Sequence, residues 1–344
     1  MEDKRFIIPI FISHFGCPHR CIYCDQNRIA YHTTSLPTAE KIQEEIEWYL
    51  KVGIHKMKKA QLVQVAFYGG SFTALALHTQ EELLRSVTPF LRDARVHSLR
   101  LSTRPDYIYP EILEILKAGK VTTVELGVQS MDDEVLRISC RGYRARTVKR
   151  AVRELKQRDF EVGIQLMVGL PGDTSEKFAS TVEKVIELRP HFVRIYPTLV
   201  IKGTALERWF KKGKYRPLPL WEAVNLTKDA MQRFRQAKIP VIRVGLQPTP
   251  SLEEGETIVA GPYHPAFRQL VESSILYDQA VSALANSLAD KGSCPTFILS
   301  PQDISNFFGQ RGMNIKRLKE SFGLKEIRVK SDPQRERGTV SLVL

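Results

Sequence analysis

Short apolar runs alternate with longer amphipathic stretches along the first 246 residues. Runs rich in β-branched and aliphatic residues predict strands at 6–11, 62–68, 98–102, 123–128, 161–168, 192–196 and 241–246. Apolar residues at helical spacing predict helices at 39–52, 79–91, 109–118, 147–158, 175–188 and 220–236. Alternation sustained this long implies parallel strands joined by right-handed crossovers. The pattern therefore predicts an α/β fold, either an open or closed βα barrel or a doubly wound sheet.

The pattern changes after Leu246. A stretch rich in Pro, Glu and Gly at 247–265 predicts a loop, and a helix follows at 266–290. The last 50 residues predict a strand, two helices separated by Gly309-Gln310-Arg311-Gly312, and two further strands, at 296–299, 301–308, 313–322, 324–330 and 338–344. We expect three parts: a core at 1–246, a linker with a helix at 247–293 and a small α+β domain at 294–344.

The composition is that of an average globular protein. Hydrophobic residues make up 43% of the 344 residues and charged residues 26%. No apolar run is long enough to span a bilayer, so we expect no membrane association. Acidic residues precede the first apolar run, and no small-residue cleavage site follows it. This start is not typical of a secretion signal, and we expect a cytoplasmic protein.

Positive charge is concentrated in one segment. The formal net charge is +13, which favours polyanionic partners. Between Arg137 and Arg158 nine basic residues occur with one acid, Glu154. Such a run is commonly a solvated helix face, and it adds modest weight to a nucleic-acid partner.

Three of the five cysteines fall within eight residues, in the sequence CPHRCIYC at 17–24. They follow the first predicted strand, at the end where α/β folds bind ligands. Three thiolates on a four-iron cluster leave one iron without a protein ligand. The alternative is a structural zinc site with His14 or His19 as the fourth ligand. We expect Cys140 and Cys294 to be ordinary small apolar residues, and the alternative for each is a substrate-side thiol or a radical relay.

The spacing C-x3-C-x2-C, with Tyr23 before the last cysteine, resembles the signature of the radical SAM superfamily. The resemblance implies a partial (β/α)6 TIM-like barrel and a [4Fe-4S] cluster held by Cys17, Cys21 and Cys24. It also implies that S-adenosylmethionine binds the free iron and is cleaved reductively to a 5′-deoxyadenosyl radical, which abstracts hydrogen from a substrate. An electron donor such as flavodoxin or ferredoxin is then required.

Further segments resemble the same family in the same order. YGGSFT follows the second strand, STRPD the third and GVQS the fourth, while RGY precedes the helix at 147–158 and MVGLPG ends the fifth strand. Ser102 stands where many relatives have glutamate, and Gln165 replaces a common aspartate. The resemblance implies cofactor-binding roles for Tyr23, Gly69, Gly70, Ser71, Ser102, Gln129, Arg141 and Gln165.

Two branches of the family compete for the substrate. CPHRCIYC, YGGSFT and STRPD most resemble the catalytic subunit of elongator, which modifies wobble uridine in tRNA. The chain ends about where the acetyltransferase domain of that enzyme would begin, so acetyl chemistry is not implied. The VQS and MVGLPG segments are equally similar to oxygen-independent coproporphyrinogen oxidase and its haem-chaperone relatives.

The C-terminal segment favours RNA. Its Gly-x-x-Gly loop between two helices resembles a KH domain, whose loop clamps a single-stranded backbone. This resemblance implies RNA contacts from Gly309, Arg311, Gly312 and Lys316. We therefore expect an enzyme that modifies a tRNA or rRNA. The alternatives are a radical SAM enzyme acting on a small molecule such as a porphyrin, and a non-catalytic haem or RNA carrier.

Overall fold

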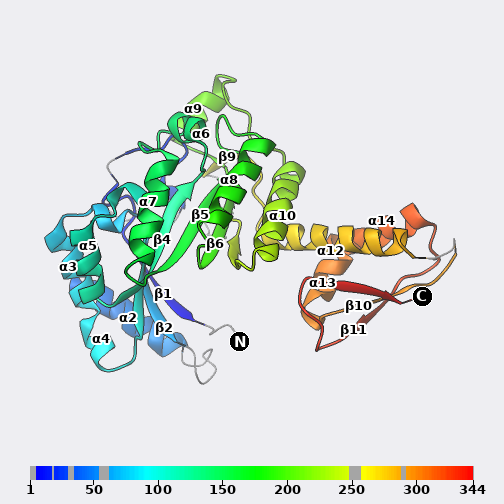
Figure 1. Ribbon diagram of the computed structural model, residues 1–344, viewed down its shortest axis with the longest axis horizontal. Helices are drawn as coiled ribbons and strands as arrows, with labels where there is room; N and C mark the ends of the chain where they lie inside the picture. The colour runs from blue at the N-terminus through cyan, green and yellow to red at the C-terminus, as the bar shows by residue number, and fades with distance from the viewer. Residues whose placement is uncertain are drawn as a thin grey trace. The chain divides into compact units, whose positions relative to one another are not determined.

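The computed structural model describes residues 5–17, 19–29, 35–53, 62–247, 257–287 and 292–343. The chain divides into two compact units, one of Met1–Leu218 with Arg233–Pro262 and one of Pro219–Gln232 with Tyr263–Leu344 (Figure 1). The predicted division into three parts stays a prediction, and 248–256 and 288–291 of its linker lie outside the described residues.

A sheet of seven parallel strands forms the centre of the first unit (Figure 1). Its order is β1 (Phe6–Phe11), β2 (Val63–Tyr68), β3 (Ser98–Thr103), β4 (Val121–Gln129), β5 (Glu161–Val168), β6 (Phe192–Pro197) and β8 (Val241–Val244). These seven strands confirm the predicted ones to within about two residues at each end. Spatial order follows chain order, whereas a doubly wound sheet reverses direction midway. The sheet curls as half of a TIM-like barrel, as expected.

Helices connect these strands. The helices that match the predicted segments are α2 (Ala39–Gly53), α3 (Leu77–Ser86), α4 (Thr88–Arg92), α5 (Pro110–Ala118), α7 (Ala145–Lys156), α8 (Ser175–Glu187) and α10 (Leu220–Gln236). The prediction of a single helix at 79–91 is wrong, because α3 and α4 are separate helices with Val87 between them. Pro89 has no N–H to donate to the preceding turn, so a new helix starts there.

Several short elements were not predicted. They are α1 (Gln26–Ile29), α6 (Asp133–Ile138), α9 (Ala205–Lys211), β7 (Val200–Ile201) and β9 (Ile258–Ala260). β7 and β9 form a two-stranded antiparallel pair. The loop expected at 247–265 therefore contains a short strand. Two or three residues are too few for a period-2 pattern to stand out in the sequence.

The two faces of the large sheet differ in polarity. Successive residues of a strand point to opposite faces. On one face, Val65, Leu99 and Val124 are fully buried. On the other face, Arg100 and Glu125 are also buried but carry charge. The inner face of the half-barrel is therefore polar, although it is buried.

The second unit is a small α+β structure. Its elements are α12 (Phe267–Ala285), β10 (Thr296–Leu299), α13 (Ile304–Phe308), α14 (Met313–Phe322), β11 (Arg328–Ser331) and β12 (Val340–Val343). β10 lies between a parallel β11 and an antiparallel β12. Leu276 and Leu284 of α12 pack with Phe297, Phe307 and Leu318, so α12 belongs to this core.

Within the residues that the structure describes, no helix is both long enough and apolar enough to cross a bilayer. The cytoplasmic location stays a prediction.

Candidate functional site

The three clustered cysteines lie on the loop after β1, at the carboxyl end of the sheet. The N–H of Cys17 donates to the carbonyl oxygen of His14, and the N–H of Cys24 to that of Cys21, both at 3.1 Å. Cys21 is buried, and Cys17 and Cys24 are half-buried. All three thiols are free. The loop thus presents three thiols where α/β folds bind ligands.

The thiols are close enough to influence one another's ionisation. Burial and the nearby Cys21 raise the pKa of Cys17 above its ordinary value. Burial, Cys21 and Cys17 raise the pKa of Cys24 to about 12. The protonated form is therefore favoured at Cys17 and Cys24, and metal binding at this loop must displace their protons.

The two histidines of the zinc alternative contact other parts of the chain. Within the described ranges, no group of three or more His, Cys, Asp or Glu side chains is placed to hold a single metal ion. His14 Nε2 instead accepts the N–H of Gln26 at 2.6 Å. The His19 ring packs against Gly142, where an added Cβ would lie 2.8 Å from the imidazole Nε2. In a four-iron cluster each cysteine binds a different iron, so the three thiols need not converge on one point.

Gly69 and Gly70 form the turn after β2 and pack against the cysteine loop. A Cβ at Gly70 would lie 2.4 Å from the carbonyl oxygen of Ile12 and 2.5 Å from that of Phe15. Gly69 has a φ of +86°, which favours glycine. The N–H of Ser71 donates to the Phe15 carbonyl at 3.0 Å. The glycine pair therefore seats the cysteine loop on the sheet, and this packing role stands beside the predicted cofactor contact.

Arg141 is a buried arginine that links β4 to the cysteine loop. Its Nη1 donates to Cys21 Sγ at 3.0 Å and to Tyr23 Oη at 3.2 Å. Its Nε and Nη2 donate to Tyr143 Oη at 3.0 and 2.7 Å, and Nη2 also donates to the Gly127 carbonyl. The structure thus brings Cys21, Tyr23 and Arg141 together.

Ser71 and Ser102 have different surroundings. The Ser71 hydroxyl is fully buried, lies 3.1 Å from Thr103 Oγ1 and accepts the N–H of Arg104 at 3.3 Å. It therefore ties the end of β2 to the end of β3. Ser102 is half-buried on the inner face of β3 and pairs in register with Glu125.

Gln129 and Gln165 extend the predicted set along β4 and β5. Gln129 follows a register shift in β4 and has a φ of 71°. Its Oε1 is buried and has no hydrogen-bond partner among the described residues. A buried acceptor without a partner is costly, so a donor group of a bound molecule would fit here. Gln165 Nε2 donates to Glu125 Oε2 at 3.1 Å.

Glu125 is the centre of a polar network that sequence reasoning missed. Its carboxylate is fully buried. The Oε1 atom accepts hydrogen bonds from Tyr68 Oη and Arg100 Nη1, both at 3.0 Å, and from Arg194 Nη2 at 2.9 Å. The Oε2 atom of Glu125 lies 2.8 Å from Arg194 Nε and accepts a hydrogen bond from Gln165 Nε2. Side chains of five strands, β2 to β6, therefore meet at one level of the barrel. The sequence did contain a signal for this network, because three otherwise apolar strands each carry a charged residue: Arg100, Glu125 and Arg194.

Helix α9 covers the cysteine loop and was also missed. The N–H of Leu206 donates to the Ile22 carbonyl at 2.7 Å, and both residues pack with Tyr215 in the apolar cluster around the loop. Thr204 and Glu207 have capping-box spacing, and Thr204 Oγ1 accepts the Glu207 N–H at 3.2 Å. That spacing could have predicted the helix.

Asp173, after the MVGLPG segment, is expected to make stability depend on pH. Burial raises its pKa to about 7, although the N–H groups of Thr174 and Gly169 oppose the shift. The folded state then holds a proton that the unfolded state releases, so this contribution to stability is lost as pH rises from about 4 to about 7.

We expect Asp173→Asn to match the wild type in urea unfolding at pH 4 and to be more stable by about 1–2 kcal/mol at pH 8. An equal difference at both pH values would contradict this prediction.

The Gly-x-x-Gly segment of the second unit is a strained, exposed loop between α13 and α14. Gly309, Arg311 and Gly312 all have positive φ, of 73°, 52° and 71°. The buried Asn314 Nδ2 fixes the loop by donating to the Phe307 carbonyl at 3.2 Å. Arg311 and Lys316 are exposed, and the RNA contacts expected of this segment stay a prediction.

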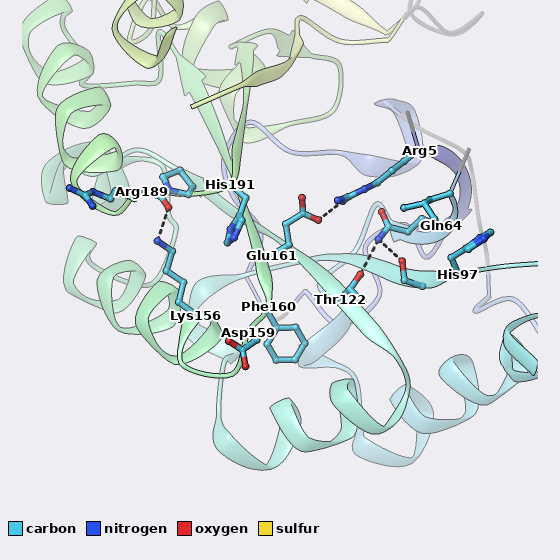
Figure 2. A pocket seen from close by; sticks show the side chains of 13 residues that line it. Arg5, Gln64, His97, Thr122, Lys156, Asp159, Phe160, Glu161, Arg189 and His191 are labelled. Atoms are coloured by element: carbon cyan, nitrogen blue, oxygen red, sulfur yellow. Dashed lines mark hydrogen bonds and ion pairs between the residues drawn. The ribbon is translucent and has the colours of Figure 1, made fainter. Parts of the chain in front are cut away.

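A cavity of about 900 Å³ lies at the other edge of the sheet, where the strands begin (Figure 2). Gln64 Nε2 lies at this edge and donates to Ser98 Oγ at 3.1 Å and Thr122 Oγ1 at 3.2 Å. His191 Nδ1 accepts the N–H of Val162 at 3.0 Å. Because α/β folds bind ligands at the carboxyl ends of strands, the cysteine loop and not this cavity marks the candidate active site.

Known families match most of the chain. Residues 11–185 match the family described as the Radical SAM superfamily. Residues 190–276 match the family described as the Radical_SAM C-terminal domain. The first match contains the cysteine loop, the glycine turn and Arg141.

Three relatives illustrate the range of similar proteins. An uncharacterized protein of Methanocaldococcus jannaschii is 30% identical over 261 residues, covering 70% of this chain and 78% of the relative. A tRNA uridine(34) acetyltransferase of Dehalococcoides mccartyi is 29% identical, covering 64% and 55%. Heme chaperone HemW of Lactococcus lactis is 27% identical, covering 58% and 51%. The chain thus spans about half the length of the last two proteins.

A solved structure shares the fold. The archaeal Methanocaldococcus infernus Elp3 with an N-terminal deletion has a TM-score of 0.60 and 23% identity, covering 78% of this chain and 62% of that one. The likeness confirms the expected α/β barrel fold.

Proposed function

The chain belongs to the radical SAM superfamily, whose members use a [4Fe-4S] cluster and S-adenosylmethionine, and from this premise we propose that it is an enzyme that modifies an RNA, either a tRNA or an rRNA. The observation that carries the proposal is the loop of three free thiols beside the buried Arg141, at the carboxyl end of a partial barrel. The residues around this loop suit both cofactors.

We assign the cluster to Cys17, Cys21 and Cys24. Arg141 holds Cys21 Sγ and the Tyr23 hydroxyl in place by hydrogen bonds. When bound, the two cofactors supply a 5′-deoxyadenosyl radical that removes a hydrogen atom from a base or ribose carbon. The apolar cluster under α9 excludes water from one side of the loop.

The remaining predicted residues would hold S-adenosylmethionine. The orphaned Gln129 Oε1 offers an acceptor for an amino or hydroxyl group. The glycine turn offers backbone groups that no side chain screens. Gln165 is held by Glu125 on the inner face of β5, with its carbonyl oxygen left as an acceptor.

Two observations support RNA as the substrate. Similar proteins include a tRNA uridine(34) acetyltransferase. The second unit carries a Gly-x-x-Gly loop between two helices, with Arg311 and Lys316 exposed. We propose that 294–344 is a KH-like domain that clamps a single-stranded backbone. Acetyl transfer is not part of the proposal, and flavodoxin or ferredoxin is the proposed electron donor.

RNA is expected to stimulate 5′-deoxyadenosine release by the reduced, cluster-loaded protein, because substrate binding completes the site. The assay compares RNA from cells without the gene, RNA from cells with it, and coproporphyrinogen. We expect only the first RNA to stimulate release and to gain a modified nucleoside by mass spectrometry. Stimulation by coproporphyrinogen alone would favour the small-molecule enzyme, and no release with any of the three would favour a carrier.

A further inference from the structure

The exposed face of helix α7 consists of cations. Its buried face is formed by Val148, Ala151, Val152 and Leu155. The opposite face carries the exposed residues that we call the α7 stripe: Arg146, Lys149, Arg150 and Arg153. They follow one another at helical spacing over about 10 Å of the helix axis.

The stripe has almost no neutralising partners. In the described part of the chain, its one ion pair joins Arg153 to Glu154 at 4.0 Å, the limit for such a contact. Exposed cations on other helices differ, since Arg85 pairs with Glu81 at 3.0 Å and Lys211 with Glu207 at 2.7 Å, both one turn away. The charge of the stripe is therefore open to a partner.

This arrangement is unfavourable for the helix itself. Arg146 and Arg150 are like charges four residues apart, as are Lys149 and Arg153, and such pairs repel each other. Arg144 stands at the N-cap without a side-chain cap, and the first turn has no acid. Cations there oppose the positive end of the helix dipole. A bound polyanion would remove both penalties.

The stripe begins beside the candidate site. Arg144 precedes α7 and follows Arg141-Gly142-Tyr143, the segment that holds Cys21. Arg144 and Arg137 line a hollow of about 620 Å³ together with His19 of the cysteine loop. Two acids, Asp133 and Glu134, also line it, but the first accepts the N–H at the start of α7 and the second pairs with a lysine of α8. Basic residues thus continue from the rim of this hollow onto the exposed face of α7, the helix that lies in front of β4 in Figure 1.

We propose that the α7 stripe binds the phosphate backbone of the substrate RNA and leads it to the hollow beside the cysteine loop. The inference rests on the proposed function. Guanidinium groups suit phosphate because they donate two parallel hydrogen bonds. An acidic electron-donor protein is the other candidate. The exposed face of α7 lacks the apolar or aromatic side chains that form the centre of protein interfaces, and this favours RNA.

The test replaces all four stripe residues by glutamine in the full, cluster-loaded protein and measures tRNA binding over a salt series. Each phosphate contact contributes about 0.7–0.9 to the slope of log K against log salt, so we expect the slope to become shallower by about 3. Affinity should fall at least about tenfold near 0.1 M salt. Release of 5′-deoxyadenosine without RNA should stay unchanged, and the thermal midpoint should rise because the repulsion is gone.

The control removes the same charge elsewhere, in the variant Lys41→Gln, Lys51→Gln, Arg92→Gln and Lys238→Gln, whose cations are exposed on other elements. It should bind like the wild type. Equal losses in both variants would overturn the proposal, as would a stripe variant with unchanged affinity and slope. Unchanged RNA binding with slower reduction by flavodoxin would assign the surface to the donor instead. A wild type that binds no RNA would overturn the proposed function itself.

Discussion

Replacing Cys17, Cys21 or Cys24 by alanine is expected to abolish the four-iron absorbance of the reconstituted protein and to reduce S-adenosylmethionine cleavage to background. The protein supplies three thiolates to four irons, so no spare ligand can take over. His14 is no substitute, because its Nε2 is bound to the N–H of Gln26. The measurements are iron and sulfide content, the visible spectrum, and 5′-deoxyadenosine after reduction.

Cys140→Ala is the matched control. Cys140 is exposed and lies outside the loop, so the variant should keep the cluster and its activity. A variant of Cys17 or Cys24 that retained full iron content would contradict the assignment. Zinc in place of iron in the anaerobically prepared wild type would support the zinc alternative instead.

Glu125→Ala is expected to destabilise the first unit by about 3–5 kcal/mol, because it leaves Arg100 and Arg194 buried without their shared carboxylate. Tyr68 and Gln165 lose their acceptor as well. The measurement is urea unfolding followed by a signal of the first unit. Glu125→Gln should lose less, since the amide keeps the volume and one acceptor oxygen.

The control for this prediction is Glu81→Ala, which removes an exposed carboxylate paired with Arg85. Exposed pairs contribute about 0–1 kcal/mol, so this variant should unfold close to the wild type. If Glu125→Ala and Glu81→Ala had the same free energy of unfolding, the network would contribute nothing to the stability of the barrel.

The strands and most helices could be predicted because local periodicity determines them. β1, β5 and α8 follow apolar runs or helical spacing that the rest of the chain does not override. The break at Val87 depends on one missing N–H at Pro89 within a continuous amphipathic pattern, and it was missed for that reason. β7 and β9 depend on pairing between distant segments, which no local window contains.

The candidate site was predictable only as an ordered set of motifs. The order placed Cys21, Tyr23 and Arg141 at one edge, and the structure brings their side chains into contact. Spacing could not show that Gly70 packs against the loop backbone. It could not show that Glu125 gathers side chains from four other strands, because that arrangement depends on the register of the sheet.

The most direct test is the electron paramagnetic resonance spectrum of the reduced, cluster-loaded wild type, recorded with and without S-adenosylmethionine. If three cysteines leave one iron open, the cofactor should bind that iron and change the g values of the reduced cluster. A spectrum that is identical in both samples, at a cofactor concentration that saturates binding, would show that no iron is open and would contradict the assignment.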